Sequence, residues 1–148
     1  MRRSFSVLIF LLISFATILA QKSPVAWTFD VNKVDDRSVQ IICNAKMNKD
    51  WVIYSSKIKE GGPIATSIEV TKGGIHKGDI IEPRPAKNEY DDLFEMEVRK
   101  FYSNATFIRN LELESEAKII EGYVQFMTCD GEKCLPPTKV PFSLALNP

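Results

Sequence analysis

The sequence predicts an all-β protein, an immunoglobulin-like antiparallel β-sandwich. Apolar and polar residues alternate with a period of two in successive short segments, and clusters of Gly, Asn, Asp and Pro separate these segments as turns. No window of the sequence keeps a helical period over three turns. In addition, a pair of cysteines around an Asp-Gly turn signal can close a local disulfide at the tip of a hairpin near the C-terminus.

Residues 1–20 have the character of a secretory signal peptide. A positively charged start precedes an apolar run from Phe5 to Leu19, and the small residue Ala20 follows. The run is too short for a comfortable membrane span. We therefore expect cleavage near Ala20, a single domain over residues 21–148, a periplasmic or secreted location, and membrane contact only through the cleaved signal. The alternative is an uncleaved N-terminal anchor.

The mature chain is expected to form about seven to nine short strands, each with one face in a core and the other in water. The region from Glu82 to Leu93 differs, because prolines and a polar run indicate a long loop, and such loops are often functional. In chain order, the apolar faces are Val25, Trp27, Phe29 and Val31; Val39, Ile41, Cys43 and Ala45; Trp51 and Ile53 with Tyr54; Phe94, Met96 and Val98; the run from Ala105 to Leu113; Ile120, Gly122, Val124 and Phe126; and Val140, Phe142, Leu144 and Leu146.

The charge balance excludes several classes of function. Lys and Arg together number 19, as do Asp and Glu, so no basic field exists to attract nucleic acid or an anionic membrane. Phosphate-binding glycine motifs are absent, and we expect no cofactor. His76 is the only histidine and lies in a Gly-flanked turn, which argues against histidine-based catalysis and against a zinc site. We expect a monomer without a bound metal.

The three cysteines have different surroundings. Cys43 shares a strand face with Val39 and Ile41, so we expect a small buried hydrophobic residue there. Cys129 and Cys134 lie on either side of a polar, charged tip, where a partner could reach the sulfurs. An exported protein can form and keep such a disulfide.

The spacing of this pair does not decide between a structural and a redox role. A disulfide that closes so short a loop stabilises a fold by about 2 kcal/mol, against about 5 kcal/mol for a loop of about a hundred residues. A hairpin tip also offers an approach path for an attacking thiolate. Lys133 favours a thiolate at Cys134, whereas Asp130 opposes one at Cys129. Of the two sulfurs, Cys134 is therefore the expected site of attack.

Several separated segments resemble one known family. They are Val25-Ala26-Trp27, Trp51 with Tyr54-Ser55, Gly61-Gly62-Pro63-Ile64-Ala65-Thr66, the stretch from Asp91 to Val98, and Cys129-Asp130-Gly131-Glu132-Lys133-Cys134-Leu135-Pro136-Pro137. Together they resemble the N-terminal periplasmic domain of the thiol:disulfide interchange protein DsbD, especially its versions in Bacteroidetes-type bacteria. The similarity covers nearly the whole mature chain, and the Cys-x4-Cys-Leu-Pro-Pro motif is its most specific part.

The resemblance implies an immunoglobulin-like sandwich in which Cys129 and Cys134 cycle between dithiol and disulfide. It implies electron transfer between thioredoxin-like periplasmic proteins through transient mixed disulfides, and a cap loop over the pair. Asp91, Asp92 and Phe94 match the cap segment best, and Leu93 is the alternative covering residue. The implied class is a component of a thiol-disulfide oxidoreductase.

Two alternatives to this relay remain open at the level of sequence. The first is a non-catalytic secreted sandwich that binds a protein and carries a structural disulfide. The second is a carrier of a soft ion such as Cu(I) on the reduced pair. The sequence has no Cys-x-x-Cys motif and no second hydrophobic span before its end at Pro148. We therefore expect any membrane electron carrier to be a separate protein.

Overall fold

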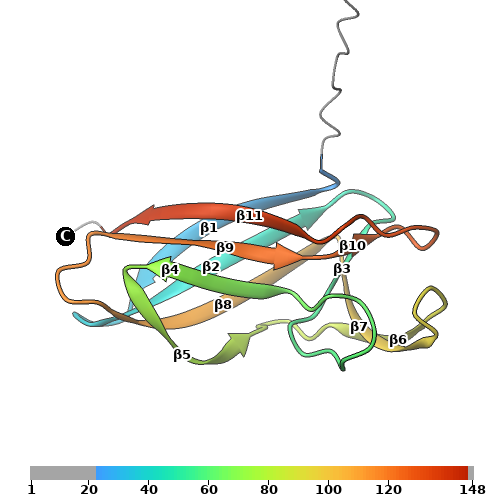
Figure 1. Ribbon diagram of the computed structural model, residues 1–148, viewed down its shortest axis with the longest axis horizontal. Coiled ribbons are helices and arrows are strands. Elements are labelled where there is room, and N and C mark those ends of the chain that lie inside the picture. The colour runs from blue at the N-terminus through green and yellow to red at the C-terminus, as the bar shows by residue number, and fades with distance from the viewer. Residues whose placement is uncertain (1–22, 147–148) are drawn as a thin grey trace, which may run out of the picture.

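The structure is a computed structural model that describes residues 23–146, and this part of the chain is built from β-strands (Figure 1). No helix occurs in residues 23–146, and hence none that is long and apolar enough to cross a membrane. The predicted signal peptide, residues 1–20, lies outside the described residues. The strands are β1 (Val25–Lys33), β2 (Ser38–Met47), β3 (Val52–Tyr54), β4 (Ser67–Lys72), β5 (Gly74–Ile81), β6 (Lys87–Asp91), β7 (Met96–Tyr102), β8 (Asn104–Leu113), β9 (Ile119–Phe126), β10 (Thr128–Cys129) and β11 (Thr138–Ala145).

Three antiparallel sheets make up the fold. One has the order β1-β2-β8-β5, the second β11-β9-β4, and the third β10-β3-β7-β6. The first two sheets run along the length of the molecule and enclose the main core, while the third forms one end (Figure 1). β11 pairs with β9 along its whole length and carries the chain from the end that holds β10 to the opposite end. The predicted all-β, immunoglobulin-like sandwich is confirmed.

Alternation in the sequence matches the observed faces of the long strands. In β9, Ile120, Gly122, Val124 and Phe126 are buried and the residues between them are partly exposed. Gly122 is required at its position because a Cβ there would lie 2.1 Å from the backbone oxygen of Glu69 and 2.7 Å from the ring of Phe142. A period of two therefore sets the register of this strand. The absence of a side chain at Gly122 lets Glu69 and Phe142 pack closely against its backbone.

The eleven strands of residues 23–146 exceed the expected seven to nine, because β4, β5, β6 and the two-residue β10 were not predicted. β4 and β5 each bury one large apolar residue, Ile68 and Ile80, so neither shows an apolar alternation. We had expected His76 to lie in a turn, and this prediction is wrong because the residue lies within β5. The expected loop from Glu82 to Leu93 contains β6, whose only fully buried residue is Asp91. Strand pairing here is set by neighbouring strands and not by local hydrophobicity.

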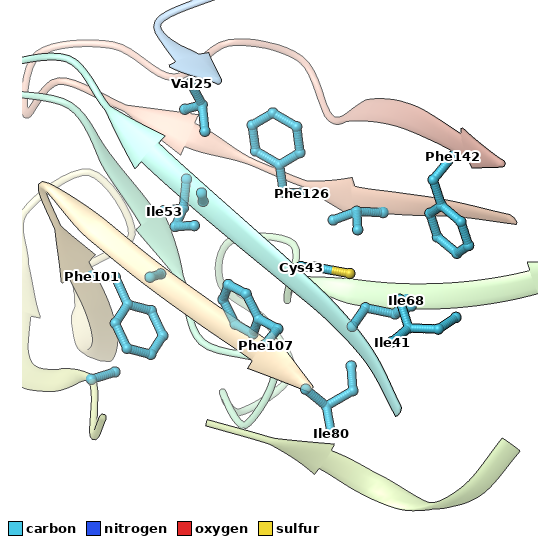
Figure 2. Close-up of a cluster of buried hydrophobic side chains, with 14 of the residues drawn as sticks. Val25, Ile41, Cys43, Ile53, Ile68, Ile80, Phe101, Phe107, Phe126 and Phe142 are labelled. Carbon is cyan, nitrogen blue, oxygen red and sulfur yellow. The ribbon is translucent and has the colours of Figure 1, made fainter. Parts of the chain in front are cut away.

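The main core lies between the two long sheets (Figure 2). Phe107 is fully buried at its centre, and its ring centroid lies 5.4 Å from that of Phe101 and 6.0 Å from that of Trp27. A second, smaller apolar cluster consists of Val52, Tyr54, Val98 and Cys129. We call it the small cluster. It lies in the third sheet, at the end of the sandwich, and it contains one sulfur of the cysteine pair.

Cys43 is a buried core residue, as the sequence predicts. Its side chain is 0% exposed, and burial raises the pKa of its thiol to about 12. We expect no alkylation of the native protein by iodoacetamide near pH 8.5, where an exposed thiol is about half ionised. After unfolding in guanidinium without a reductant, one thiol per chain should react. Mass spectrometry before and after unfolding measures this, and labelling of Cys43 in the native state would contradict the buried assignment.

Candidate redox site

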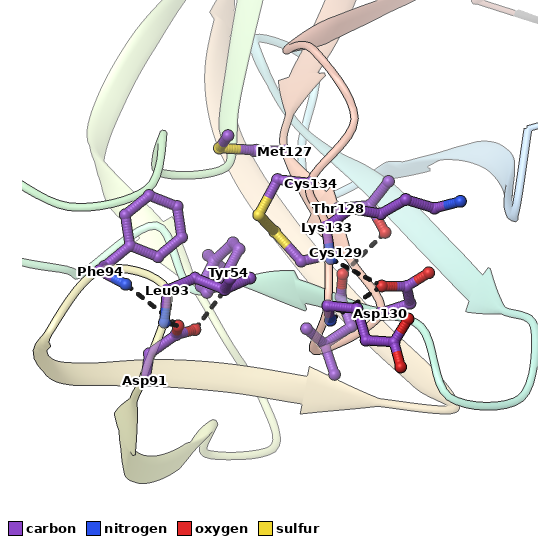
Figure 3. The surroundings of a disulfide bond; sticks show 12 residues. Tyr54, Asp91, Leu93, Phe94, Met127, Thr128, Cys129, Asp130, Lys133 and Cys134 are labelled. Carbon is purple, nitrogen blue, oxygen red and sulfur yellow. Dashed lines mark hydrogen bonds between the residues drawn. A yellow bond between two sulfur atoms is a disulfide. The ribbon is translucent and has the colours of Figure 1, made fainter.

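The cysteine pair forms a disulfide across a tight hairpin, as the Asp-Gly signal predicts (Figure 3). The Cα atoms of Cys129 and Cys134 are 4.1 Å apart. The carboxylate of Asp130 accepts hydrogen bonds from the backbone N–H groups of Glu132, at 3.0 Å, and Lys133, at 2.9 Å. Gly131 has a φ of 91°, in the left-handed region that glycine adopts most easily. The local sequence therefore builds the turn that brings the sulfurs together.

The hairpin is fixed to the third sheet by its first strand. Cys129 pairs with Val52 of β3, and the hydroxyl of Thr128 donates a hydrogen bond to the backbone oxygen of Val52 at 2.8 Å. On the return side, the N–H of Leu135 donates to the backbone oxygen of Thr128 at 2.9 Å. Cys129 is thus held on a strand that pairs with β3, although the tip between the cysteines is exposed.

The two sulfurs are not equally accessible, and this corrects the expectation that a partner could reach both. Cys129 is 1% exposed and belongs to the small cluster, whereas Cys134 is half-buried and packs against that cluster from outside. The polar tip indicates exposure of the tip residues, but it does not indicate where the side chains of the flanking cysteines lie. Only Cys134 offers a surface to an approaching thiol in this state.

The predicted cap segment, residues 91–94, lies next to the small cluster. Phe94 packs against the cluster and meets the ring of Tyr54 edge to face, with 5.9 Å between the ring centroids. Figure 3 shows Leu93 and Phe94 on the same side of the disulfide as Tyr54. Leu93 is 43% exposed, and Asp92 is also exposed. The structure therefore brings Phe94 and Asp91 to the small cluster, and it leaves Asp92 and Leu93 at the surface.

Asp91 is buried and forms hydrogen bonds through both carboxylate oxygens. Oδ1 accepts a hydrogen bond from the N–H of Leu93 at 2.9 Å and a longer one from the N–H of Phe94 at 3.4 Å. Oδ2 accepts a hydrogen bond from the hydroxyl of Tyr54 at 3.1 Å and lies 2.9 Å from the ammonium of Lys100. This single carboxylate joins the backbone of the cap segment to β3 and β7.

The charge state of this group follows from its surroundings. Burial alone raises the pKa of Asp91, but the Lys100 ammonium and the hydrogen bonds outweigh it and hold the pKa below the ordinary 3.8. Burial, followed by the Asp91 charge, raises the pKa of Tyr54 far above its usual range. Asp91 is therefore ionised at neutral pH, and Tyr54 keeps the proton that it donates.

Lys100 was missed by the sequence reasoning, although a signal was present. It follows Met96 and Val98 at a spacing of two, so it lies on the same apolar strand face. A lysine at such a position, with only 13% of its side chain exposed, needs a buried acidic partner. Tyr54 was predicted as part of an apolar strand face and of the resemblance, but its hydrogen bond to Asp91 could not be read from the sequence.

Comparison with known proteins gives one family and several similar folds. The model of the family described as thiol:disulfide interchange protein DsbD, N-terminal, matches residues 18–146. The N-terminal domain of DsbD from Neisseria meningitidis, in the reduced form, is 13% identical with a TM-score of 0.54, over 83% of this chain and 87% of that chain. The N-terminal periplasmic domain of ScsB from Proteus mirabilis is 21% identical with a TM-score of 0.58, over 82% of this chain and 45% of that chain.

A third similar structure is a complex between the DsbD N-terminal and the PilB N-terminal domains from Neisseria meningitidis. There the identity is 12% and the TM-score 0.51, over 86% of this chain and 87% of that chain. No relative was found among curated protein sequences. The structural likenesses support the sandwich fold, and the family match covers both the fold and the disulfide hairpin. The chain therefore belongs to the family of DsbD N-terminal domains, a family of thiol-disulfide interchange proteins.

Proposed function

We propose that this protein is a periplasmic relay domain that exchanges electrons with thioredoxin-like proteins through Cys129 and Cys134. The observation that carries the proposal is the asymmetric disulfide, in which Cys129 is 1% exposed and Cys134 is half-buried at the surface of the small cluster. A purely structural disulfide does not need an accessible sulfur, whereas thiol-disulfide exchange requires that a thiolate approach one sulfur of the bond. The family match supports exchange over a purely structural disulfide.

Reduction of the pair begins at Cys134. A partner thiolate attacks Sγ of Cys134, a mixed disulfide forms, and the bond electrons pass to Sγ of Cys129, which takes up a proton. The second thiol of the partner then attacks the partner's sulfur in the mixed disulfide. This step leaves the partner with an internal disulfide and releases Cys134 in the reduced form. Two electrons and two protons have moved to the pair.

Delivery of the electrons reverses these roles. The Cys134 thiolate attacks the disulfide of an acceptor and forms a new mixed disulfide. Cys129 then attacks Sγ of Cys134, which restores the internal disulfide and releases the reduced acceptor. Cys129 acts as the resolving sulfur because its position on β10 holds it next to Cys134 while Val52 and Tyr54 keep other thiols away.

The cap segment protects the pair between encounters. Phe94 covers the small cluster beside the disulfide, and a docking partner displaces it. Leu93, 43% exposed, then contributes to the surface that the partner touches. Asp92 lies beside it at the surface of the cap segment.

The cellular setting follows from the proposed signal peptide. Cleavage near Ala20 releases a monomeric domain over residues 21–148 into the periplasm, and a separate membrane protein supplies the electrons. The existence of a complex between the DsbD N-terminal and the PilB N-terminal domains from Neisseria meningitidis supports a protein partner for this domain. We propose no metal or organic cofactor, because the two sulfurs carry the electrons themselves.

The reduction potential of the pair tests this function. We expect a two-electron couple above about −300 mV, because structural disulfides lie below that value. The measurement equilibrates the protein with defined ratios of oxidised and reduced dithiothreitol and counts free thiols by alkylation and mass spectrometry. A second measurement follows the oxidation of a reduced thioredoxin-like protein. A pair that stays oxidised below −300 mV and accepts no electrons from that protein would show that the disulfide is structural.

A further inference from the structure

The base of the cap segment is anchored more firmly than an exposed loop requires. Asp91 is 4% exposed, Lys100 is 13% exposed and Tyr54 is fully buried, yet all three are joined by polar contacts. A buried carboxylate with an ammonium, a phenol and a backbone N–H around it is costly to assemble, since each group loses its water. The loop turn itself needs only the bonds to the N–H groups of Leu93 and Phe94, so the contacts to Lys100 and Tyr54 serve something else.

The positions of Lys100 and Tyr54 indicate which part of the structure their contacts to Asp91 hold in place. Tyr54 lies in the small cluster with Cys129, and its ring also supports the ring of Phe94. Lys100 lies on β7, and its ammonium also approaches Glu89 of β6 at 3.6 Å. Asp91 ends β6 and begins the cap segment. These contacts therefore tie the start of the cap segment to β3 through Tyr54 and to β7 through Lys100.

We propose that Lys100 and Tyr54 are positioning residues that hold the cap segment closed through Asp91, and thereby make the disulfide selective for protein thiols over small thiols. This inference rests on the exchange function proposed above. A small thiol makes no contacts that could displace the cap, so it reacts only during spontaneous opening. A docking protein opens the cap with its own binding contacts and depends less on spontaneous opening.

Loss of Lys100 changes the balance between the closed and open cap. The Lys100→Met side chain keeps the length and the apolar contacts, but it leaves the Asp91 carboxylate buried without a cation. That carboxylate is then stabilised by moving toward water or by taking up a proton. Movement toward water breaks its bonds to Leu93 and Phe94, and protonation weakens them. In either case the cap opens more often.

The test compares two reductants on a matched set of variants. With reduced glutathione as the small thiol, we expect Lys100→Met and Tyr54→Phe to be reduced about tenfold faster than the wild type, the factor that corresponds to one lost hydrogen bond to a charged group. With a reduced thioredoxin-like protein, the rates should change less than about threefold. The matched control is Lys77→Met, which removes an exposed ion pair to Glu112 on the first sheet.

The outcomes separate the inference from the proposed function. Equal glutathione rates in the wild type and in folded Tyr54→Phe would overturn the cap role, and so would an equal acceleration in Lys77→Met. Because Tyr54→Phe removes only a hydroxyl, it keeps the test available if Lys100→Met does not fold, and circular dichroism establishes folding. If the wild type exchanges with glutathione but not with the thioredoxin-like protein, the exchange function fails while the effect of the cap on small thiols can still be measured.

Discussion

Replacing Cys134 by serine is expected to abolish mixed-disulfide formation with a thioredoxin-like protein, whereas Cys129→Ser is expected to trap it. In Cys134→Ser the remaining sulfur belongs to Cys129, which is 1% exposed and surrounded by Val52, Tyr54 and Val98. A partner sulfur cannot reach Sγ of Cys129 unless the strand that holds this cysteine moves. In Cys129→Ser the remaining sulfur is half-buried at the surface, and no resolving thiol is left to release the partner.

The experiment mixes each variant with a thioredoxin-like protein whose own resolving cysteine has been replaced and whose remaining cysteine is activated as a mixed disulfide with a chromogenic thiol. Non-reducing electrophoresis and mass spectrometry then detect the covalent complex. The control is Cys43→Ala, which removes the buried third cysteine and should leave trapping by Cys129→Ser unchanged when the two are combined. Trapping through Cys129 with equal yield would contradict the assignment of Cys134 as the attacked sulfur.

Replacing Phe107 by alanine is expected to lower the free energy of unfolding by about 3–5 kcal/mol, the usual cost of removing a buried aromatic side chain. The side chain is fully buried, and its ring packs against both Trp27 and Phe101. These neighbours come from β1 and β7, so the cavity would lie where β1, β7 and β8 pack together. A loss of this size is a large part of the stability of a small domain.

Urea unfolding followed by tryptophan fluorescence measures this change. The comparison variant is Ile75→Ala, in which the replaced side chain is 63% exposed on β5, and its effect should stay within about 0.5 kcal/mol. Both proteins should be measured with the disulfide intact, so that the unfolded chain has the same cross-link. A change below about 1 kcal/mol for Phe107→Ala would mean that the core closes around the missing ring and is less tightly packed than the structure shows.

The long strands could be predicted from sequence because their burial alternates. β1, β2, β8, β9 and β11 each have one face in the main core, and a period of two is visible wherever that holds. β4 and β6 were missed because their residues are mostly polar and their place is set by pairing with β9 and β7. Strand order also depends on contacts between distant segments, which no local pattern contains.

The site was only partly predictable for a related reason. The disulfide hairpin is local, so Asp130 and Gly131 were enough to predict it. The burial of Cys129 depends on β3 and β7, which are far away in the sequence. The cap segment came from the resemblance alone, and its anchor at Lys100 required a contact between strands that the sequence indicates only by a lysine on an apolar face.

The course of β11 has a practical consequence for biosensor design. This strand carries the chain away from the disulfide hairpin along the full length of β9, so the last described residues lie at the opposite end of the sandwich (Figure 1). The start of β1, in contrast, lies near the turn that leads into β3, where Asn48 donates a backbone hydrogen bond to Pro24. A fluorescent reporter or an electrode linker should therefore be attached after Leu146, because a group at that end leaves the space in front of Cys134 open to a docking protein.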